Sequence, residues 1–328
     1  MSKQEYLLSY EVDKNEWDDF VKRSPQGSVF SETWYLDAMN VKYKILAVYK
    51  NERIIAGIVL TKNEINTWSN PMLVKYLGVL LGNEQKNVSQ KVLSQQFKIL
   101  ELLIGELKKY KSFDYYFHPN FTNWTPFYWN GFAQHTRYTY RIDLNKEFIE
   151  IEKKIHHNIK RNIKNAQKLK VVIKRDIGID NLLKMVNETF EKQGGNSPYN
   201  DKLQIAIKKF FKDGNFVSFG AYDTRGKIIS ACGLVYDEKS SYLILNGSTM
   251  HDQIRGANAL MIFEAIKYFK EKGLETFDFE GSMLPGVEQF YRRFGGDLVP
   301  YYRIWQDNFF NYFKAKAKKI YKKYKYGR

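Results

Sequence analysis

The strongest constraint on this chain is an internal repeat of short motifs that recur in the same order. The matched motifs are Phe113-Asp114 with Phe277-Asp278, Phe127-Tyr128 with Phe290-Tyr291, and Tyr140-Arg141-Ile142 with Tyr302-Arg303-Ile304. The predicted elements around these motifs also recur: two short helices, a hairpin, a strand, a long helix, and a closing strand, helix and strand. An order of elements that repeats along a chain indicates duplication of one structural unit. The sequence therefore predicts two α/β domains, 1–144 and 145–305.

Local patterns place the elements of each copy. In the first copy we expect a hairpin at 44–49 and 53–61, a strand at 74–81, a helix at 88–110, and strands at 113–117 and 136–143. In the second we expect helices at 181–192 and 202–212, a hairpin at 216–223 and 227–237, a strand at 241–246, a helix at 258–272 and a strand at 299–305. The Asp223-Thr224-Arg225-Gly226 turn supports the second hairpin, because Asp and Gly are favoured in tight turns.

Composition indicates a globular protein of more than one domain. The chain has 328 residues, of which 44% are hydrophobic, and this length exceeds what one core usually supports. Its single cysteine, Cys232, lies in an apolar run and is interpreted as a small core residue rather than a nucleophile. The five histidines lack metal-site spacing, so no metal is expected. No signal peptide or membrane-spanning run is expected either, and the predicted location is the cytoplasm.

The net charge of +16 is concentrated in two segments. Residues 308–328 hold seven lysines, one arginine and no acid, with aromatic residues at helical spacing. We expect a C-terminal helix, 306–328, that packs on the first domain and leaves its lysines free to contact an anionic membrane or RNA. Residues 148–169 predict a second amphipathic helix, with isoleucines on one face and lysines on the other.

The segment from Phe277 to Gly281 predicts a short strand followed by a polar turn. Alternation along a strand would place the two phenylalanines on one face and the carboxylates of Asp278 and Glu280 on the other. When the two copies are aligned, Asp114 of the first copy corresponds to Asp278, whereas Tyr116 corresponds to Glu280. Asp278 is therefore interpreted mainly as shared architecture, and Glu280 as the stronger candidate for chemistry.

These motifs together resemble the FemABX-like peptidyl and aminoacyl transferases and the related FemAB-like (BioF2-like) acetyltransferases. The matching segments are Ile142-Asp143-Leu144, Asn165-Ala166-Gln167-Lys168, Gly256-Ala257-Asn258-Ala259-Leu260, the strand from Phe277 to Gly281, and Phe290 to Gly296. The resemblance implies an α/β fold of two tandem GNAT-like domains, each a mixed sheet flanked by helices. Two features depart from the family: its lysine falls on Tyr291, and only Gln253, Gly256 and Asn258 fit the glycine-rich phosphate loop.

Acyl transfer to an amine needs a carboxylate that deprotonates or positions the nucleophile. The candidate catalytic residues are Glu280, Asp278 and Tyr291, with Glu288 as a further carboxylate. The resemblance implies substrate contacts from Gln193, Tyr199, Ser282, Arg292, Arg293, Trp34, Lys75 and Tyr76. It also implies donor contacts from Gln253, Arg255, Gly256 and Asn258. Each of these residues also has a simpler interpretation as a packing, turn or surface residue.

The favoured function is transfer of an aminoacyl or acyl group to an amine of a cell-envelope precursor, by direct attack and without a covalent enzyme intermediate. The donor would be aminoacyl-tRNA or acyl-CoA, with no tightly bound cofactor. The acceptor would be a peptidoglycan peptide, an amino sugar or a lipid-linked intermediate. Two alternatives stay open: a GNAT-like binding protein without catalysis, and an adaptor that binds a membrane surface or RNA through its C-terminal helix, at the inner face of the membrane.

Overall fold

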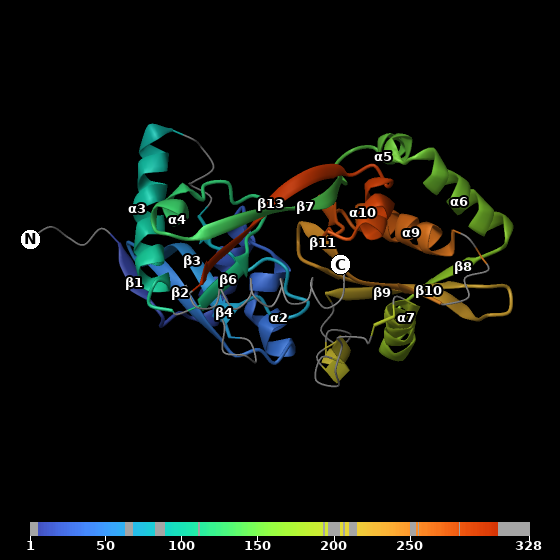
Figure 1. Cartoon of the computed structure of the whole chain (residues 1–328), viewed down its shortest axis with the longest axis horizontal. Helices are drawn as coiled ribbons and strands as arrows, with labels where there is room; N and C mark the ends of the chain where they lie inside the picture. Colours follow the sequence, from blue (N-terminus) through green and yellow to red (C-terminus); the bar gives the residue numbers. More distant parts are fainter. Residues whose placement is uncertain are drawn as a thin grey trace, which may run out of the picture. The chain divides into compact units, whose positions relative to one another are not determined.

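The computed structural model describes residues 6–62, 68–82, 89–110, 112–192, 194–195, 204–205, 207–209, 215–249, 254, 256–281 and 283–307 (Figure 1). The chain divides into two compact units. Unit 1 comprises 1–33, 41–137 and 301–328, and unit 2 comprises 34–40 and 138–300. The sequence-based domain limits, 1–144 and 145–305, remain a prediction about independent folding.

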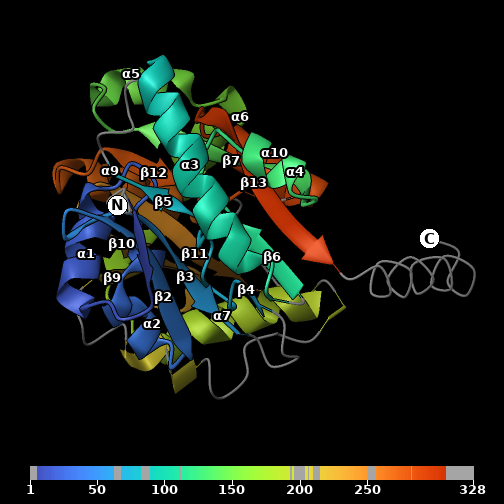
Figure 2. The ribbon, with the colours of Figure 1, turned by 90° about the vertical axis from the view of Figure 1, so that its left-hand side faces the viewer.

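Unit 1 is built on an antiparallel sheet and a parallel strand pair, both packed with helices. Its strands are β1 (Leu7–Ser9), β2 (Tyr43–Lys50), β3 (Arg53–Thr61) and β5 (Leu80–Leu81), in the order β1-β2-β3-β5, and β4 (Trp68–Ser69) beside β6 (Ser112–Tyr116). Its helices are α1 (Lys14–Arg23), η1 (Val29–Ser31), α3 (Gln90–Leu107) and α4 (Thr125–Trp129). Figure 2 shows α3 in front of strands β2 and β3, and the apolar side of α3 is buried through Ile99, Leu100, Leu103, Ile104 and Leu107.

Unit 2 contains a mixed sheet in the order β7-β12-β11-β10-β9-β8. Its elements are β7 (Ala133–Asp143), α5 (Phe148–Lys154), α6 (His157–Lys168), β8 (Val172–Arg175), α7 (Ile179–Lys192), β9 (Phe216–Tyr222), β10 (Ile228–Tyr236), β11 (Ser240–Ser248), α9 (Ala257–Glu271), β12 (Thr276–Asp278) and α10 (Pro285–Arg292). The β11–β12 pair is parallel, whereas the other neighbours are antiparallel. A short helix from the N-terminal third, α2 (Thr33–Ala38), has most of its residues in this unit.

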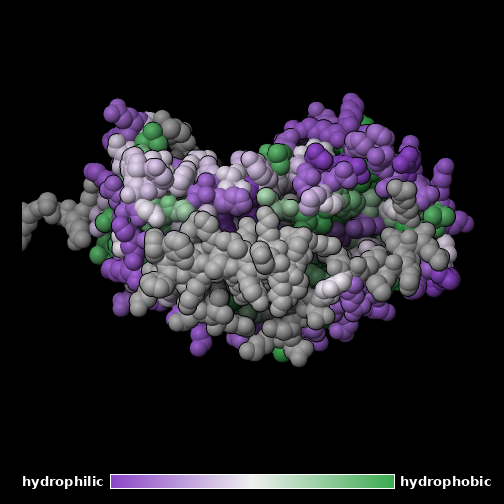
Figure 3. All heavy atoms as spheres, in the orientation of Figure 1, coloured by the Kyte–Doolittle hydropathy of each residue, from purple (hydrophilic) through white to green (hydrophobic). Residues whose placement is uncertain are grey.

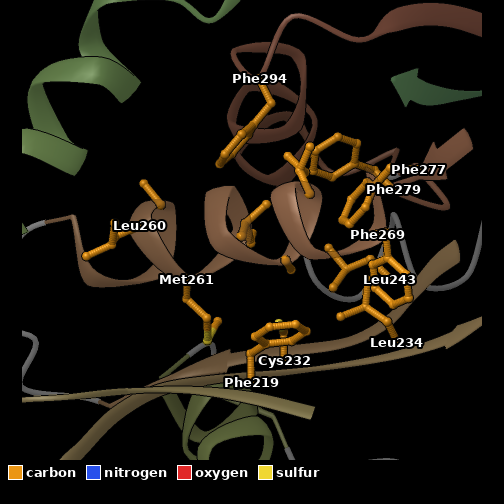
Figure 4. Close-up of a cluster of buried hydrophobic side chains, with 14 of the residues drawn as sticks. Phe219, Cys232, Leu234, Leu243, Leu260, Met261, Phe269, Phe277, Phe279 and Phe294 are labelled. Carbon is orange, nitrogen blue, oxygen red and sulfur yellow. The ribbon is translucent and has the colours of Figure 1, made fainter. Parts of the chain in front are cut away.

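The core of unit 2 lies between α9 and the sheet. Figure 4 shows Met261 and Phe269 of α9 facing Phe219, Cys232 and Leu234 of the strands. Cys232 is fully buried and unpaired, and burial raises the pKa of its thiol. This confirms Cys232 as a core residue, because a thiol that stays protonated and inaccessible is a poor nucleophile.

The closing strand of each repeat ends in the other unit. β7 closes the first repeat, yet its residues from Tyr138 onward belong to unit 2, where β7 pairs with β12. The second repeat ends with β13 (Asp297–Asp307), whose residues from Tyr301 onward belong to unit 1, where β13 pairs with β6. The two repeats have therefore exchanged their final strands.

This exchange explains why the same Asp and Arg recur in both copies. In unit 2, Arg141 Nε donates to Asp278 Oδ2 at 2.8 Å. In unit 1, Arg303 Nε donates to Asp114 Oδ1 at 2.7 Å. Each pair joins the penultimate strand of one repeat to the closing strand of the other, which is a contact that the linear motif order does not reveal.

Three expectations about secondary structure are wrong in detail. The helix expected at 148–169 is two helices, because Ile155 has extended backbone and His156 caps α6 by accepting a hydrogen bond from Asn158 N at Nδ1. Its isoleucines at 151, 155, 159 and 163 are nevertheless all buried, so the apolar pattern survives the break. The strand expected at 74–81 is reduced to β5, and β12 ends at Asp278 rather than at Glu280.

The C-terminal helix expected at 306–328 and the helix expected at 202–212 lie wholly or mostly outside the described residues. Among the described residues, no helix is both long and apolar enough to cross a membrane.

Candidate functional site

Asp278 is a buried anchor at the end of β12. Its side chain is fully buried, and its two oxygens accept three hydrogen bonds: Oδ1 from Thr139 Oγ1 at 2.5 Å and from Glu280 N at 2.7 Å, and Oδ2 from Arg141 Nε at 2.8 Å. A carboxylate that accepts this many hydrogen bonds holds the backbone and side chains around it in place. The geometry favours the architectural interpretation of Asp278 over a role as a proton acceptor.

The chain turns sharply after Asp278. Glu280 and Gly281 both adopt left-handed backbone, with φ values of 56° and 65°. A Cβ at Gly281 would lie 2.0 Å from the carbonyl oxygen of Tyr138, so only glycine fits there. The Asp278 carboxylate stabilises this turn by accepting from Glu280 N. Glu280 is therefore held in a conformation that is uncommon for a non-glycine residue, and such strain clusters at functional positions.

The same turn separates β12 from β11. The two strands pair only as far as Tyr242 opposite Asp278, and Phe279 N then donates to Tyr140 O of β7 at 3.0 Å. β11 continues to Ser248, paired on its other side with β10. Residues 243–247 of β11 thus have no paired strand on the β12 side within the described part of the chain. Glu280 is half-buried and lies where the two strands diverge.

Two asparagines mark the open edge of β11 and the start of α9. Asn246 of β11 and Asn258 of α9 each have a buried Oδ1 without a hydrogen-bond partner among the described residues. Each of these two oxygens is a hydrogen-bond acceptor available to a bound molecule. At the far end of the edge, Ser248 N donates to Thr189 Oγ1 of α7 at 2.8 Å.

The position of Gly256 requires glycine for a packing reason, in addition to its place in the expected phosphate loop. Its φ is 108°, and a Cβ there would lie 2.1 Å from Asn162 O of α6. Gly256 therefore permits close packing of the start of α9 against α6. It still directly precedes the first turn of α9, whose N–H groups are suited to bind phosphate.

Tyr35 of α2 is a neighbour of Glu280 that sequence reasoning did not select. Its ring is fully buried, and burial, followed by the charge of Glu280, raises the pKa of its phenol. Tyr35 is therefore a neutral phenol near neutral pH. The predicted contact residue Trp34 is half-buried and packs edge-on against the Tyr35 ring. Helical spacing alone marks Tyr35 as a core residue, so its relation to Glu280 had no sequence signal.

The other predicted residues near α10 have mixed environments. Tyr291 is buried, with its ring 4.9 Å from that of Phe279, so it fills the core rather than replacing the family lysine in the turn. Glu288 Oε1 accepts from Tyr140 OH and lies 3.4 Å from Arg292 Nε, and burial together with Glu288 raises the pKa of Tyr140 to about 12. Arg292 is mostly exposed, whereas Arg293 is half-buried.

The remaining predicted residues lie in unit 1 or outside the described residues. Tyr76 is buried in unit 1, and the ammonium of Lys75 lies 5.3 Å from the ring of Tyr301 in the same unit. Five further candidates lie outside the described residues: Gln193, Tyr199, Ser282, Gln253 and Arg255. No group of three or more His, Cys, Asp or Glu side chains suited to a metal ion occurs in the part of the chain that the structure describes.

Comparison with known proteins supports the fold. Residues 153–292 match the family described as acetyltransferase (GNAT) domain. No curated protein matches the sequence. The solved structure of FemX is similar over 91% of this chain and 97% of that chain, with a TM-score of 0.70 and 14% identity.

Two further solved structures have similar folds. The C-terminal domain of a putative lysylphosphatidylglycerol synthetase from Agrobacterium fabrum covers 92% of this chain and 93% of its own, with a TM-score of 0.57 and 13% identity. A tandem GNAT protein from the clavulanic acid biosynthesis pathway covers 92% and 97%, with a TM-score of 0.51 and 9% identity. These structures confirm the predicted mixed α/β fold. The chain therefore shares the fold of FemX and of a tandem GNAT protein, and its residues 153–292 match the acetyltransferase (GNAT) domain family.

Proposed function

We propose that this protein transfers an acyl group from acyl-CoA to a primary amine, with Glu280 as the proton acceptor. The observation that carries the proposal is the divergence of β12 from β11, with Glu280 at the point where the strands separate. The open edge supplies room for a donor beside a carboxylate, and the two residues just before Glu280 are fixed by their packing and hydrogen bonds.

An extended donor suits the open edge of β11. Unpaired N–H and C=O groups of an exposed strand edge bind extended chains that carry amide groups, as an added strand would. The pantetheine arm of CoA is such a chain, because it contains two amides. Asn246 offers a side-chain acceptor in the same strand. The first turn of α9 would receive the diphosphate, with Gly256 before it and Asn258 within it.

The proposed reaction is direct transfer. Glu280 takes a proton from the ammonium of the acceptor, and the resulting amine attacks the thioester carbonyl. The C–N bond forms as a tetrahedral oxyanion develops, the nitrogen of this intermediate loses its second proton to water, and the C–S bond then breaks. The CoA thiolate takes up the proton held by Glu280, which restores the carboxylate. Tyr35, protonated and electrostatically coupled to Glu280, serves as a positioning residue that holds this carboxylate.

The proposed acceptor is an amine of a cell-envelope precursor, either a peptidoglycan peptide or an amino sugar, or a lipid-linked form of these. Support comes from the FemX fold and from a relative whose name refers to lysylphosphatidylglycerol synthesis. The proposed compartment is the cytoplasm.

A second donor, aminoacyl-tRNA, is favoured by one specific observation. The exposed side of α6 is rich in lysine and arginine, and α6 packs against the start of α9. Cations beside the donor edge would attract the phosphates of an RNA acceptor end. The chemistry at Glu280 would be the same, with an ester in place of the thioester.

The test is a transfer assay with labelled acetyl-CoA and with lysyl-tRNA as donors and a nucleotide-linked muramyl peptide as acceptor. Product is followed by mass spectrometry. Glu280→Gln should lower turnover by about 10² to 10⁴, the usual contribution of a positioned proton acceptor. Glu238→Gln, an acid in the turn between β10 and β11, is the control and should leave turnover unchanged. Equal activity of the Glu280→Gln and wild-type proteins would remove Glu280 from the mechanism.

A further inference from the structure

Transfer from acyl-CoA makes no use of a continuous basic stretch in unit 2, although an aminoacyl-tRNA donor would contact part of it. From Lys153 to Arg175 the chain contains nine Lys and Arg residues and no Asp or Glu, a count taken along the printed sequence. The stretch covers the end of α5, all of α6 and the edge strand β8. Figure 3 shows hydrophilic side chains gathered over α5 and α6.

The cations of α6 share one face of the helix. Arg161, Lys164 and Lys168 are exposed and follow the three- and four-residue spacing of one helical stripe. Ile159, Ile163 and Ala166 form the opposite, buried stripe. No ion pair links any of these three cations to an acid among the described residues. Lys154, by contrast, is paired with Asp297 at 3.1 Å.

An exposed apolar side chain lies at the end of this basic stripe. Leu169, the C-cap residue that directly follows α6, is 43% exposed. Lys168 and Lys170 flank Leu169 in the chain, and Lys170 adopts left-handed backbone with φ 54°. An exposed apolar side chain flanked by lysines is typical of surfaces that insert shallowly into a charged membrane interface.

We propose that the outer surface of α6, defined by Arg161, Lys164, Lys168, Leu169 and Lys170, docks on an anionic lipid bilayer. Charge complementarity and the exposed apolar side chain of Leu169 favour this partner. The cations attract anionic headgroups, and Leu169 enters the boundary between headgroups and acyl chains. A phosphodiester backbone such as RNA would use the cations but has no apolar phase to receive Leu169.

The test measures sedimentation of the full-length protein with vesicles of phosphatidylglycerol and phosphatidylcholine. Each lysine near an anionic surface contributes about 1 kcal/mol, or roughly fivefold in partitioning. Lys164→Gln with Lys168→Gln should therefore weaken binding about 25-fold. Leu169→Ser should weaken it roughly fivefold through the lost apolar contact and without any change of charge. Binding to pure phosphatidylcholine should be weaker still than either variant shows on anionic vesicles.

Matched controls keep the test specific. Lys91→Gln with Lys98→Gln, two exposed lysines on α3, changes the net charge equally and should leave vesicle binding unchanged. Lys318→Gln with Lys319→Gln measures how much the basic C-terminal segment contributes to vesicle binding. Circular dichroism confirms that each variant is folded. The proposal is overturned if the α6 and α3 pairs weaken binding equally, or if only the C-terminal pair weakens it. It is also overturned if Leu169→Ser has no effect while the α6 pair weakens binding of tRNA.

Discussion

Replacing Asp278 by asparagine should destabilise unit 2 far more than the corresponding change destabilises unit 1. Asparagine keeps an oxygen for Thr139 and for the backbone N–H of Glu280. It places an amide where Oδ2 accepts from Arg141, whose side chain is only 14% exposed. Breaking a buried pair from one side leaves an uncompensated charge and costs about 3 to 5 kcal/mol. For a domain of this size the melting temperature of unit 2 would fall by about 6 to 20 °C.

The duplicated fold supplies the control for this change. Asp114→Asn removes the equivalent partner of Arg303, but the two side chains of that pair are 29% and 37% exposed. Water can solvate the remaining charge there, so the expected loss is about 1 kcal/mol or less. Hydrogen exchange of β11 amides and β3 amides in increasing guanidinium chloride reports the two units separately. Equal losses for Asp278→Asn and Asp114→Asn would refute the argument that burial makes the Asp278–Arg141 pair the main anchor of the turn.

Three further changes have defined outcomes. Gly281→Ala should lower the free energy of unfolding in urea by about 3 kcal/mol, because φ is 65° and the added Cβ would lie 2.0 Å from Tyr138 O. Gly286→Ala is the control, since there is open space around Gly286, and it should not lower that free energy; equal effects of the two changes would contradict the close approach at Gly281. Burial, then His157 and Arg293, lowers the pKa of His156 below 6.5, so the unfolded state binds a proton first and stability falls as pH drops below about 6.5; His156→Asn keeps an N-cap and should flatten that pH dependence of the melting temperature. Lys44→Met should cost about 1 kcal/mol, because its ammonium lies 5.1 to 5.5 Å from the rings of Tyr10, Trp68 and Tyr110, and an equal loss in Lys42→Met would remove that explanation.

Much of the architecture follows from local patterns. The hairpin at β2 and β3, the long helix α3 and the helix α9 lie within a few residues of their expected positions, because each has strong periodicity and clear end signals. The repeat of Asp and Arg motifs also led to the tandem fold. Its consequence, the exchange of β7 and β13 between units, was not predictable, because strand pairing depends on contacts far apart in the chain.

The candidate site was only partly predictable. The comparison of the two copies singled out Glu280 as the residue that differs, and its role stays a prediction; alternation, however, placed it on a strand, whereas it lies in the turn after β12. The turn depends on hydrogen bonds from Thr139 and Arg141 to Asp278, and both donors lie in a strand that sequence assigned to the other copy. Tyr35 was missed because a buried aromatic residue on a short helix carries no signal beyond packing. Asn246, which directly follows the apolar run 243–245, is a signal that could have indicated the open edge of β11.

The most direct test of the central claim is acyl transfer by the wild-type protein together with a binding measurement on a donor-edge variant. Asn246→Leu removes the polar side chain from the open edge while Glu280 remains. Calorimetry with acetyl-CoA should show binding to the wild type that weakens several-fold in Asn246→Leu, whereas Glu280→Gln should bind acetyl-CoA normally and lose transfer. We predict a donor site along β11 with Glu280 beside the reacting carbonyl. This prediction would be contradicted if Asn246→Leu left acetyl-CoA binding unchanged and Glu280→Gln left transfer unchanged.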